Sequence, residues 1–360
     1  AVYTKNVVKA APLLITKEHL KDGKARAVLA NSGNANACAP YGEEYAEESC
    51  AAAAKALGLN ASDFIVASTG VIGQTLPVGV IVDGIPALVS ALNPDGSQDA
   101  AAAIMTTDTV LKEYAVETTI GGRAVRIGGI AKGSGMIHPN MGTMLCFITT
   151  DCAISAEMIK KALLETVTVS FNRISVDGDT STNDMCSLMA SGLAGNAYIK
   201  GDCEDYTAFA AALKELCVKL AVVMASDGEG ATHLITCTVS GASDIATAET
   251  LSKSVISSTL TKAAIFGADA NWGRVLCAMG YSGIEFDPEK VSVTFQSSAG
   301  SVHVCQNGRG LDFDEALAKK ILTEHDITIA VDIASGTAEC TCWGCDITYD
   351  YIRINGDYRT

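Results

Sequence analysis

The hydrophobic and polar positions of the chain change repeatedly between the spacing of helices and that of strands. A stretch rich in Ala, Glu and Lys predicts a helix over 45–57 that ends at Gly58. Further helices are predicted over 77–92, 97–105, 155–167, 184–193, 206–225, 246–260 and 314–321. Pro86 should kink or break the first of these. Strands are predicted over 63–68, 116–120, 124–130, 144–149, 233–239, 291–295, 327–332 and 346–354, with Gly121-Gly122 as a hairpin turn.

This order of elements is typical of an α/β protein whose helices and strands do not simply alternate. The 360 residues are enough for two or more domains and a large buried core. Hydrophobic residues make up 48% of the chain but aromatics only 6%, so the core should consist of Ala, Val, Ile and Leu. No run approaches the roughly 20 apolar residues of a membrane-spanning helix. We therefore expect no membrane partner.

The charge of the chain excludes one class of partner. The net charge is −15, and Lys and Arg form no cluster. Such a surface would repel a phosphate backbone, which argues against binding to nucleic acid. The acidic balance is compatible with a cationic substrate, but ordinary solubility explains it equally well.

The 13 cysteines indicate a reduced, cytoplasmic protein. They are odd in number and scattered, and many lie in apolar runs, where a thiol acts as a small hydrophobe. Cys340, Cys342 and Cys345 form a C-x-C-x-x-C run that could belong to a zinc or iron–sulfur site. No fourth ligand follows nearby, so we interpret the run as core packing. A metal- or redox-responsive module remains the non-enzymatic alternative.

The segment 131–150 is the strongest candidate for chemistry. A small, glycine-rich run leads to Gly142-Thr143, and a strand-like segment follows directly. Cleavage before Thr143 would give a residue whose hydroxyl is the nucleophile and whose own amine is the base. A free α-amino group has a pKa near ~8, whereas an internal threonine needs an outside base. Taken alone, the segment fits a plain turn before a strand better than a cleavage site, because most glycine-rich runs before strands are only turns.

Seven matching segments extend this observation over nearly the whole chain. Besides the cleavage segment they are NSGNANA at 31–37, STGVIG at 68–73, SVDGDTSTND at 175–184, DGEGAT at 227–232, GADANWGR at 267–274 and YIRINGDYRT at 351–360. In this order they resemble the glutamate N-acetyltransferase family, also called ornithine acetyltransferases. The resemblance implies a sandwich of two sheets flanked by helices with a smaller C-terminal α/β lobe. Relative to the family an opening segment is missing, so we expect a processed or trimmed start.

The resemblance implies roles for four residues in acyl transfer. Thr143 would be the nucleophile, first for the carbonyl of Gly142 and then for the acetyl group. The family commonly has alanine before its threonine, so Gly142 is a departure; a smaller residue relieves crowding and should still allow cleavage. Thr69 and Gly70 match the oxyanion pair of the family, a hydroxyl and a backbone amide.

The resemblance also implies a substrate pocket. Its positions are Thr106, Lys132, Thr143, Glu229, Asn355 and the chain-ending Thr360. Thr106 is assigned by its offset from Lys132, and the assignment could slip by one to Thr107. A cation at Lys132 would also lower the pKa of the new α-amine. Glu229 would meet an amino group of the substrate.

These expectations describe an acyltransferase of arginine biosynthesis. It would move acetyl from N-acetylornithine to glutamate through an acetyl-Thr143 intermediate, without a metal or organic cofactor. The chain would divide into 1–142, 143–240 and a C-terminal lobe at 241–360, and the two cleavage fragments would assemble as α2β2. Acetyl-CoA is left open as a second donor. The enzymatic alternative is an N-terminal-nucleophile amidase or aminopeptidase, with water in place of glutamate.

Overall fold

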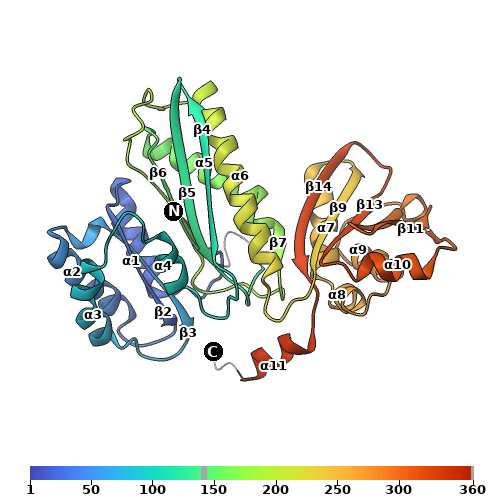
Figure 1. The fold of residues 1–360 in the computed structure, drawn as a ribbon, viewed down its shortest axis with the longest axis horizontal. Coiled ribbons are helices and arrows are strands. Elements are labelled where there is room, and N and C mark those ends of the chain that lie inside the picture. The colour runs from blue at the N-terminus through green and yellow to red at the C-terminus, as the bar shows by residue number, and fades with distance from the viewer. Residues whose placement is uncertain (139–143, 358–360) are drawn as a thin grey trace. The chain divides into compact units, whose positions relative to one another are not determined.

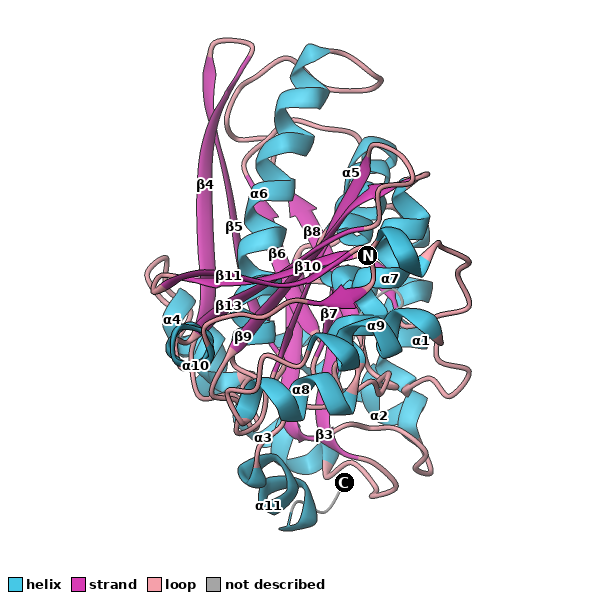
Figure 2. Cartoon of the chain, turned by 90° about the vertical axis from the view of Figure 1, so that its right-hand side faces the viewer, coloured by secondary structure: helices cyan, strands magenta, loops and turns pink. Residues whose placement is uncertain are grey.

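The fold is a mixed arrangement of helices and strands, as the sequence predicts (Figures 1 and 2). The computed structural model describes residues 1–138 and 144–357. The chain divides into two compact units. Within the described residues, the first comprises Ala1–Asn172 and Asp179–Ala221, and the second Arg173–Gly178 and the chain from Val222 onward. The last boundary falls within one helix. These two units do not test the predicted domains 1–142, 143–240 and 241–360, because the first predicted boundary is a cleavage site.

The first unit contains a five-stranded and a two-stranded sheet. In spatial order, the larger sheet contains β1 (Val2–Tyr3), β8 (Met185–Ala190), β6 (Leu145–Thr150), β5 (Arg123–Lys132) and β4 (Lys112–Ile120). Only β6 and β8 are parallel. The smaller sheet pairs β2 (Ala27–Asn34) in parallel with β3 (Phe64–Val71). The helices are α1 (Ala11–His19), α2 (Gly42–Leu57), α3 (Val78–Ser90), α4 (Ser97–Ala103), α5 (Ala156–Val169) and the part of α6 (Glu204–Ser226) up to Ala221.

Local sequence signals explain several of these elements. Gly58 ends α2 in the left-handed conformation that glycine favours. The β4–β5 turn places Gly121 and Gly122 at φ 55° and 74°, as a tight hairpin requires. The hydroxyl of Ser155 caps α5 by accepting a hydrogen bond from the Met158 N–H. Such residues fix where elements begin and end.

The second unit is built on a seven-stranded sheet. Its order is β12 (Arg309–Gly310), β11 (Gly300–Gln306), β10 (Ser292–Ser297), β13 (Asp326–Asp332), β9 (Leu234–Ala242), β14 (Ala338–Cys345) and β7 (Ile174–Ser175). The helices are α7 (Ile245–Ser257), α8 (Thr259–Phe266), α9 (Trp272–Gly280), α10 (Glu315–Leu322) and α11 (Tyr349–Asp357). Short 3-10 turns elsewhere cover Leu20–Asp22, Ala61–Asp63, Phe171–Arg173 and Pro288–Lys290.

The C-x-C-x-x-C run lies in the core of the second unit. Cys340, Cys342 and Cys345 are buried along β14, and the first two pack in one cluster with Val239 and Ile329. Among the described residues, no group of three or more His, Cys, Asp or Glu side chains could hold a metal ion. The burial of all three thiols in the core is what the packing interpretation predicts.

Two predicted elements are wrong in type. Residues 184–193 are predicted as a helix, but strand β8 occupies 185–190. Its Met, Cys and Leu side chains fit either element, and parallel pairing with β6 decides. Residues 346–354 are predicted as a strand, but helix α11 begins at Tyr349. Thr348 caps this helix because its Oγ1 accepts from the N–H groups of Asp350 and Tyr351.

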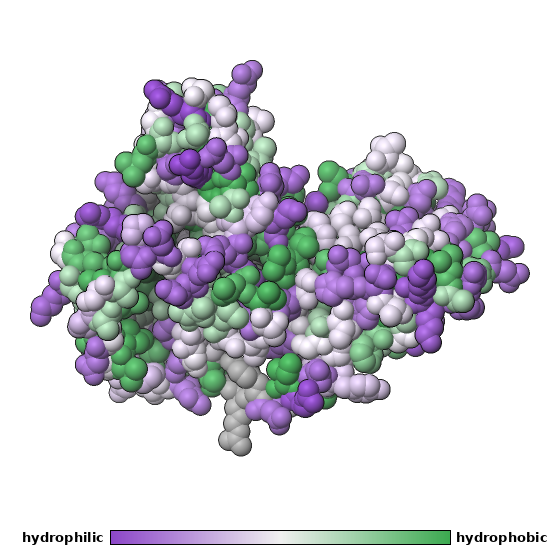
Figure 3. All heavy atoms as spheres, in the orientation of Figure 1, coloured by the Kyte–Doolittle hydropathy of each residue, from purple (hydrophilic) through white to green (hydrophobic). Residues whose placement is uncertain are grey.

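Pro86 does not break α3, so of the predicted kink or break the break is wrong. The helix buries only Ile85, while Val80 and Leu88 are exposed. Figure 3 shows hydrophobic residues at the surface in this region, at the left of the view. Because α3 lies at the surface, water can satisfy the carbonyl whose helical partner the proline removes.

Within the described part of the chain, no helix combines the length and apolar character needed to cross a bilayer.

Candidate active site

The proposed oxyanion pair lies at the end of β3, where two backbones come very close. Gly70 pairs with Gly33 on β2 and has φ 128°. A Cβ added to Gly70 would lie 2.3 Å from the carbonyl carbon of Gly33. Real Cβ atoms do not make such contacts with backbone, so only glycine fits. Thr69 precedes it and is partly buried. The predicted strand ends at residue 68, just before both residues, whereas β3 continues to Val71 and includes them.

Three of the sequence segments meet beside this strand end. The side-chain amide of Asn183 donates hydrogen bonds to the carbonyls of Ala35 (2.6 Å) and Ser68 (2.8 Å). The Ser68 hydroxyl donates to the Asn31 side chain at 2.5 Å. These bonds are buried or partly buried, so they fix the backbone around Thr69 strongly.

Lys132 joins three of the predicted site residues. It ends β5, and its side chain is only 9% exposed. The Lys132 Nζ donates to Thr106 Oγ1 at 2.8 Å and lies 3.5 Å from Thr69 Oγ1. The structure therefore brings Thr69, Thr106 and Lys132 together.

Sequence reasoning missed the carboxylate beneath this group. Asp108 Oδ1 accepts hydrogen bonds from the Lys112 ammonium (2.8 Å) and the Gly133 N–H (2.6 Å). Asp108 Oδ2 accepts from the Thr106 N–H (3.1 Å) and lies 3.7 Å from the Lys132 Nζ. The side chains of Asp108 and Lys112 are fully buried. The available signal was the i,i+4 spacing of Asp108 and Lys112, which is too common to be informative alone.

Burial and the neighbouring lysines change the pKa of Asp108 in opposite directions. Burial by itself raises the pKa of the Asp108 carboxyl, but the ammonium groups of Lys132 and Lys112 and two hydrogen bonds outweigh it. The pKa of Asp108 is therefore lowered, and the carboxylate stays ionised at neutral pH. Asp108, Lys112 and Lys132 carry one negative and two positive charges.

The pKa of a second buried carboxyl, that of Asp184, is raised, in contrast to that of Asp108. Asp184 is buried at the start of β8, beside Met144. Burial raises its pKa well above the usual range, and hydrogen bonds from Ser181, Thr4 and Met144 and the charge of Lys132 oppose this only in part. Among the residues that the structure describes, none forms a hydrogen bond with its Oδ2 atom. Burial therefore shifts Asp184 toward its neutral form relative to an exposed carboxyl.

We predict that Asp184→Asn stabilises the protein as pH rises. Because the folded-state pKa is raised, the folded state holds this proton more tightly than the unfolded state does. The wild type therefore loses stability as pH rises from about 3.9, the ordinary carboxyl value, to the folded-state pKa. Asparagine mimics the neutral acid and removes this loss, a gain of at least about 1 kcal/mol above that range. Thermal unfolding of both proteins at several pH values measures the difference, and parallel stability curves would contradict the prediction.

In the second unit, Glu229 and Asn355 meet although 126 residues separate them. The Asn355 amide donates to Glu229 Oε2 at 2.6 Å from helix α11. Glu229 is buried, whereas Asn355 is exposed. The two residues that the resemblance assigned to one pocket are thus in direct contact.

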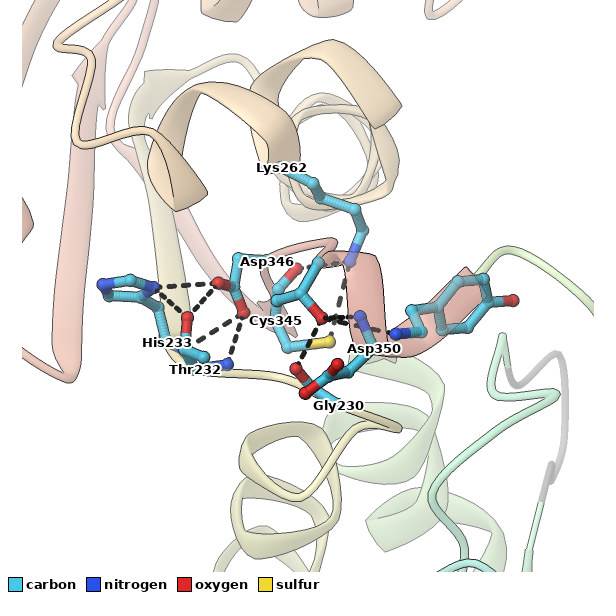
Figure 4. A network of polar contacts seen from close by, with 9 residues as sticks. Gly230, Thr232, His233, Lys262, Cys345, Asp346 and Asp350 are labelled. Atoms are coloured by element: carbon cyan, nitrogen blue, oxygen red, sulfur yellow. Dashed lines mark hydrogen bonds and ion pairs between the residues drawn. The ribbon is translucent and has the colours of Figure 1, made fainter. Parts of the chain in front are cut away.

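A polar network around Asp346 holds the loop that carries Glu229 (Figure 4). Asp346 Oδ1 accepts from the backbone N–H groups of Thr232 (2.8 Å) and His233 (3.0 Å), and Oδ2 contacts both side chains. Thr348 donates to the Gly230 carbonyl at 2.7 Å. Burial raises the pKa of Asp346, but the hydrogen bonds from His233 and Thr232 outweigh this and lower it. Sequence reasoning missed Asp346, which follows β14 directly.

Three predicted site residues, Gly142, Thr143 and Thr360, lie outside the described residues. The structure therefore leaves their placement untested. Of the others, Thr69, Gly70, Thr106 and Lys132 form one group in the first unit, and Glu229 and Asn355 form a second group in the second unit.

The fold and the first group define a mixed α/β protein with a buried lysine and two threonine hydroxyls gathered at the ends of β3 and β5. Comparison with known proteins identifies the family. The chain belongs to the ArgJ family, which matches it over residues 1–360. This confirms the resemblance drawn from the sequence.

Relatives of this chain cover its full length. It is 51% identical over 360 residues to the arginine biosynthesis bifunctional protein ArgJ of Symbiobacterium thermophilum, covering 100% of this chain and 89% of that protein. It is 48% identical over 361 residues to the arginine biosynthesis bifunctional protein ArgJ 1 of Clostridium acetobutylicum. This match covers 99% of this chain and 88% of that protein. A crystal structure of argJ from Bacillus halodurans is 43% identical with a TM-score of 0.56 and covers 59% of this chain and 98% of that one.

Proposed function

We propose that this protein is a glutamate N-acetyltransferase of arginine biosynthesis. It moves acetyl from N2-acetyl-L-ornithine to L-glutamate. The full-length family match and the names of the relatives support this role. The observation that carries the proposal is the contact of the buried Lys132 ammonium with the hydroxyls of Thr106 and Thr69, next to Gly70.

The reaction begins with self-cleavage between Gly142 and Thr143. The freed Thr143 attacks the acetyl carbonyl, and its own α-amine accepts the hydroxyl proton. The Thr69 hydroxyl and the Gly70 amide stabilise the oxyanion that forms; one such donor typically changes the rate about 100- to 1,000-fold. The protonated α-amine returns this proton to the amine of ornithine as the C–N bond breaks, which leaves acetyl-Thr143. The amino group of glutamate then attacks this ester and gives up a proton through the same α-amine to the Thr143 oxygen, and acetylglutamate is released. No metal or organic cofactor takes part.

The remaining predicted residues bind substrate in this proposal. Lys132 and Thr106 contact the acetyl donor, and the Thr106 assignment is favoured over Thr107 by the 2.8 Å bond to Lys132. Glu229 pairs with an amino group of the substrate, with Asn355 and Thr360 completing the pocket. The Asn355–Glu229 bond supports a shared role for these two.

We also propose the oligomeric state and the cellular location that the sequence predicts. Fragments 1–142 and 143–360 stay together as an α2β2 assembly. Residues 1–142 and 143–240 form the two-sheet sandwich, and residues 241–360 form the C-terminal lobe. The protein is cytoplasmic. Because the relatives are named bifunctional, acetyl-CoA is proposed as a second donor, which would add acetylglutamate synthesis.

An isotope-transfer experiment tests the reaction. With N-acetylornithine labelled in the acetyl group, we expect the label in acetylglutamate when glutamate is present and no rapid release of acetate without it. Chromatography of the products measures both. Acetate as the main product in the presence of glutamate, or its rapid release without glutamate, would favour the amidase alternative and reject the transferase. Labelled acetyl-CoA in place of acetylornithine tests the second donor.

A further inference from the structure

The two glycines that flank Glu229 pack directly against the chain where β14 ends and α11 begins. A Cβ added to Gly228 would lie 2.6 Å from the Sγ of Cys345, and one added to Gly230 would lie 2.7 Å from the Cβ of Asp350. Gly230 also has φ 67°, a conformation that glycine adopts at little cost. Figure 4 shows Gly230 beside Asp350. The backbone on both sides of Glu229 is therefore in close contact with one other segment.

The Thr348 hydroxyl joins this loop to α11. It donates to the Gly230 carbonyl at 2.7 Å and accepts from the backbone N–H groups of Asp350 (3.1 Å) and Tyr351 (3.3 Å). A hydroxyl has one proton and two lone pairs, so these three bonds use its full capacity. Thr348 is only 7% exposed, which makes a lost bond costly because water does not readily replace it. One buried side chain thus ties the backbone next to Glu229 to the first turn of the helix.

The same helix returns to Glu229 through Asn355. The Asn355 amide donates to the Tyr351 carbonyl at 3.0 Å and to Glu229 Oε2 at 2.6 Å. Tyr351 and Asn355 are four residues apart and so lie on the same face of α11. The contacts close a ring, because Thr348 holds the loop at Gly230 and also caps the helix that holds the Glu229 side chain. A shift at the start of α11 would therefore move the Asn355 amide relative to the carboxylate.

Two further bonds anchor the segments of this ring. The buried Lys262 ammonium donates to the Cys345 carbonyl at the end of β14. Asp346 accepts from the N–H groups of Thr232 and His233, just before β9 begins. Both segments are thus fixed to the sheet of the second unit, and the bond at Thr348 sets where the loop lies against α11.

We propose that Thr348 is a positioning residue for Glu229. This inference rests on the proposed function, in which Glu229 pairs with an amino group of the substrate, and deepens it. The Thr348 hydroxyl holds the loop and the helix together, so the Glu229 carboxylate is in place before the substrate binds. A preformed site binds more tightly because binding does not have to order it. Thr348 itself touches neither the substrate nor the reacting atoms in this role.

Thr348→Val tests this role, because valine has nearly the shape of threonine but lacks the hydroxyl. The loop and α11 then lose their link, and part of the binding energy is spent on ordering them. We expect the KM for N-acetylornithine to rise about 10-fold while kcat changes by less than about twofold. Thr348→Ser keeps the hydroxyl and should hold KM within about threefold of the wild-type value. Steady-state kinetics at saturating glutamate measure both constants.

Thr250→Val is the matched control for this substitution. Thr250 lies on α7 of the same unit, and its hydroxyl also donates to a backbone carbonyl, that of Ala246, but at an exposed position. The same chemical change there should leave KM and kcat at their wild-type values.

A purely structural role of Thr348 predicts a different pattern. It would lower kcat and thermal stability together, and the loss would be the same with or without the Glu229 carboxylate. Thr348→Val is therefore also combined with Glu229→Gln, which by itself should lower kcat/KM. If Thr348 acts through Glu229, Thr348→Val lowers kcat/KM by less than about twofold in this background. An equal loss in both backgrounds would overturn the inference.

A weaker substitution keeps the test open if Thr348→Val does not fold. Thr348→Cys replaces the hydroxyl by a thiol, which is a weak donor and a weak acceptor. We expect it to raise KM about threefold in the wild-type background and to have no effect in Glu229→Gln. A wild-type KM in Thr348→Cys would then reject the inference.

A readout without activity separates this inference from the proposed function. Hydrogen exchange followed by mass spectrometry measures the opening of peptides that cover 227–233 and 349–357. We expect about 10-fold faster exchange in both segments of Thr348→Val, whereas a helix cap alone would change only α11. If the wild type transfers no acetyl but both segments open faster, the proposed function fails and the link through Thr348 stands. If the wild type transfers acetyl and Thr348→Val keeps its KM, only the inference fails.

Discussion

Thr143→Ala is expected to give a single uncut chain of 37.2 kDa that transfers no measurable acetyl. In the proposed mechanism this hydroxyl attacks first the Gly142 carbonyl and then the acetyl donor, so the substitution should abolish cleavage and catalysis together. Loss of a nucleophile lowers turnover by at least about 1,000-fold. Intact-mass spectrometry of the purified protein measures cleavage, and the isotope-transfer reaction measures activity.

Thr143→Ser is the control for this experiment. Serine keeps the hydroxyl and the future α-amine, so it should still cleave and retain part of the activity, while differing from the wild type by one methyl group. The wild type should give two polypeptides, 1–142 and 143–360. A wild-type protein that is fully active as one uncut chain would reject the self-cleavage proposal. So would a Thr143→Ala protein that is cut at the same place.

The elements that the sequence predicted well are those with local signals. The hairpin around Gly121-Gly122 needs only two glycines in a turn, and α5 needs only the cap at Ser155. Strand β8 lacks such a signal. Its side chains suit either structure, and parallel pairing with β6, which only the folded chain supplies, decides. Helix α11 does have a local signal, the cap at Thr348, which the sequence analysis did not use.

The candidate site divides in the same way. Lys132 and Thr69 are predictable because they belong to segments shared with a known family, and Thr106 follows from its offset from Lys132. The structure shows that the three side chains meet. Asp108 and Asp346 are different. Each acts through contacts with residues that its own sequence neighbourhood does not reveal, such as the N–H of Gly133 and the loop at His233. Ordinary acidic residues become informative only once their buried partners are known.

Gly70→Ala is expected to abolish activity by displacing the backbone of the proposed oxyanion site. Its Cβ would lie 2.3 Å from the Gly33 carbonyl carbon and 2.6 Å from the Asn34 nitrogen, and both are backbone atoms. Backbone cannot rotate away as a side chain can, so the two strands must separate at this point. Moving the Gly70 amide and the neighbouring Thr69 should lower kcat about 100-fold or more. It should also destabilise the fold by roughly 1–3 kcal/mol, because φ 128° is strained for alanine.

Gly33→Ala provides the matched control for the clash. Gly33 lies opposite Gly70 on β2 and also has a positive φ, 101°, but a Cβ there meets nothing within 4 Å. It therefore carries the conformational strain without the steric conflict. We expect Gly33→Ala to lose stability to a similar degree and to keep most of its kcat, whereas Gly70→Ala loses both. Thermal unfolding and steady-state kinetics of the two variants separate the effects. Equal losses of kcat would show that backbone strain alone matters here, and the close approach of β2 and β3 would then have no special role in positioning Thr69 and Gly70.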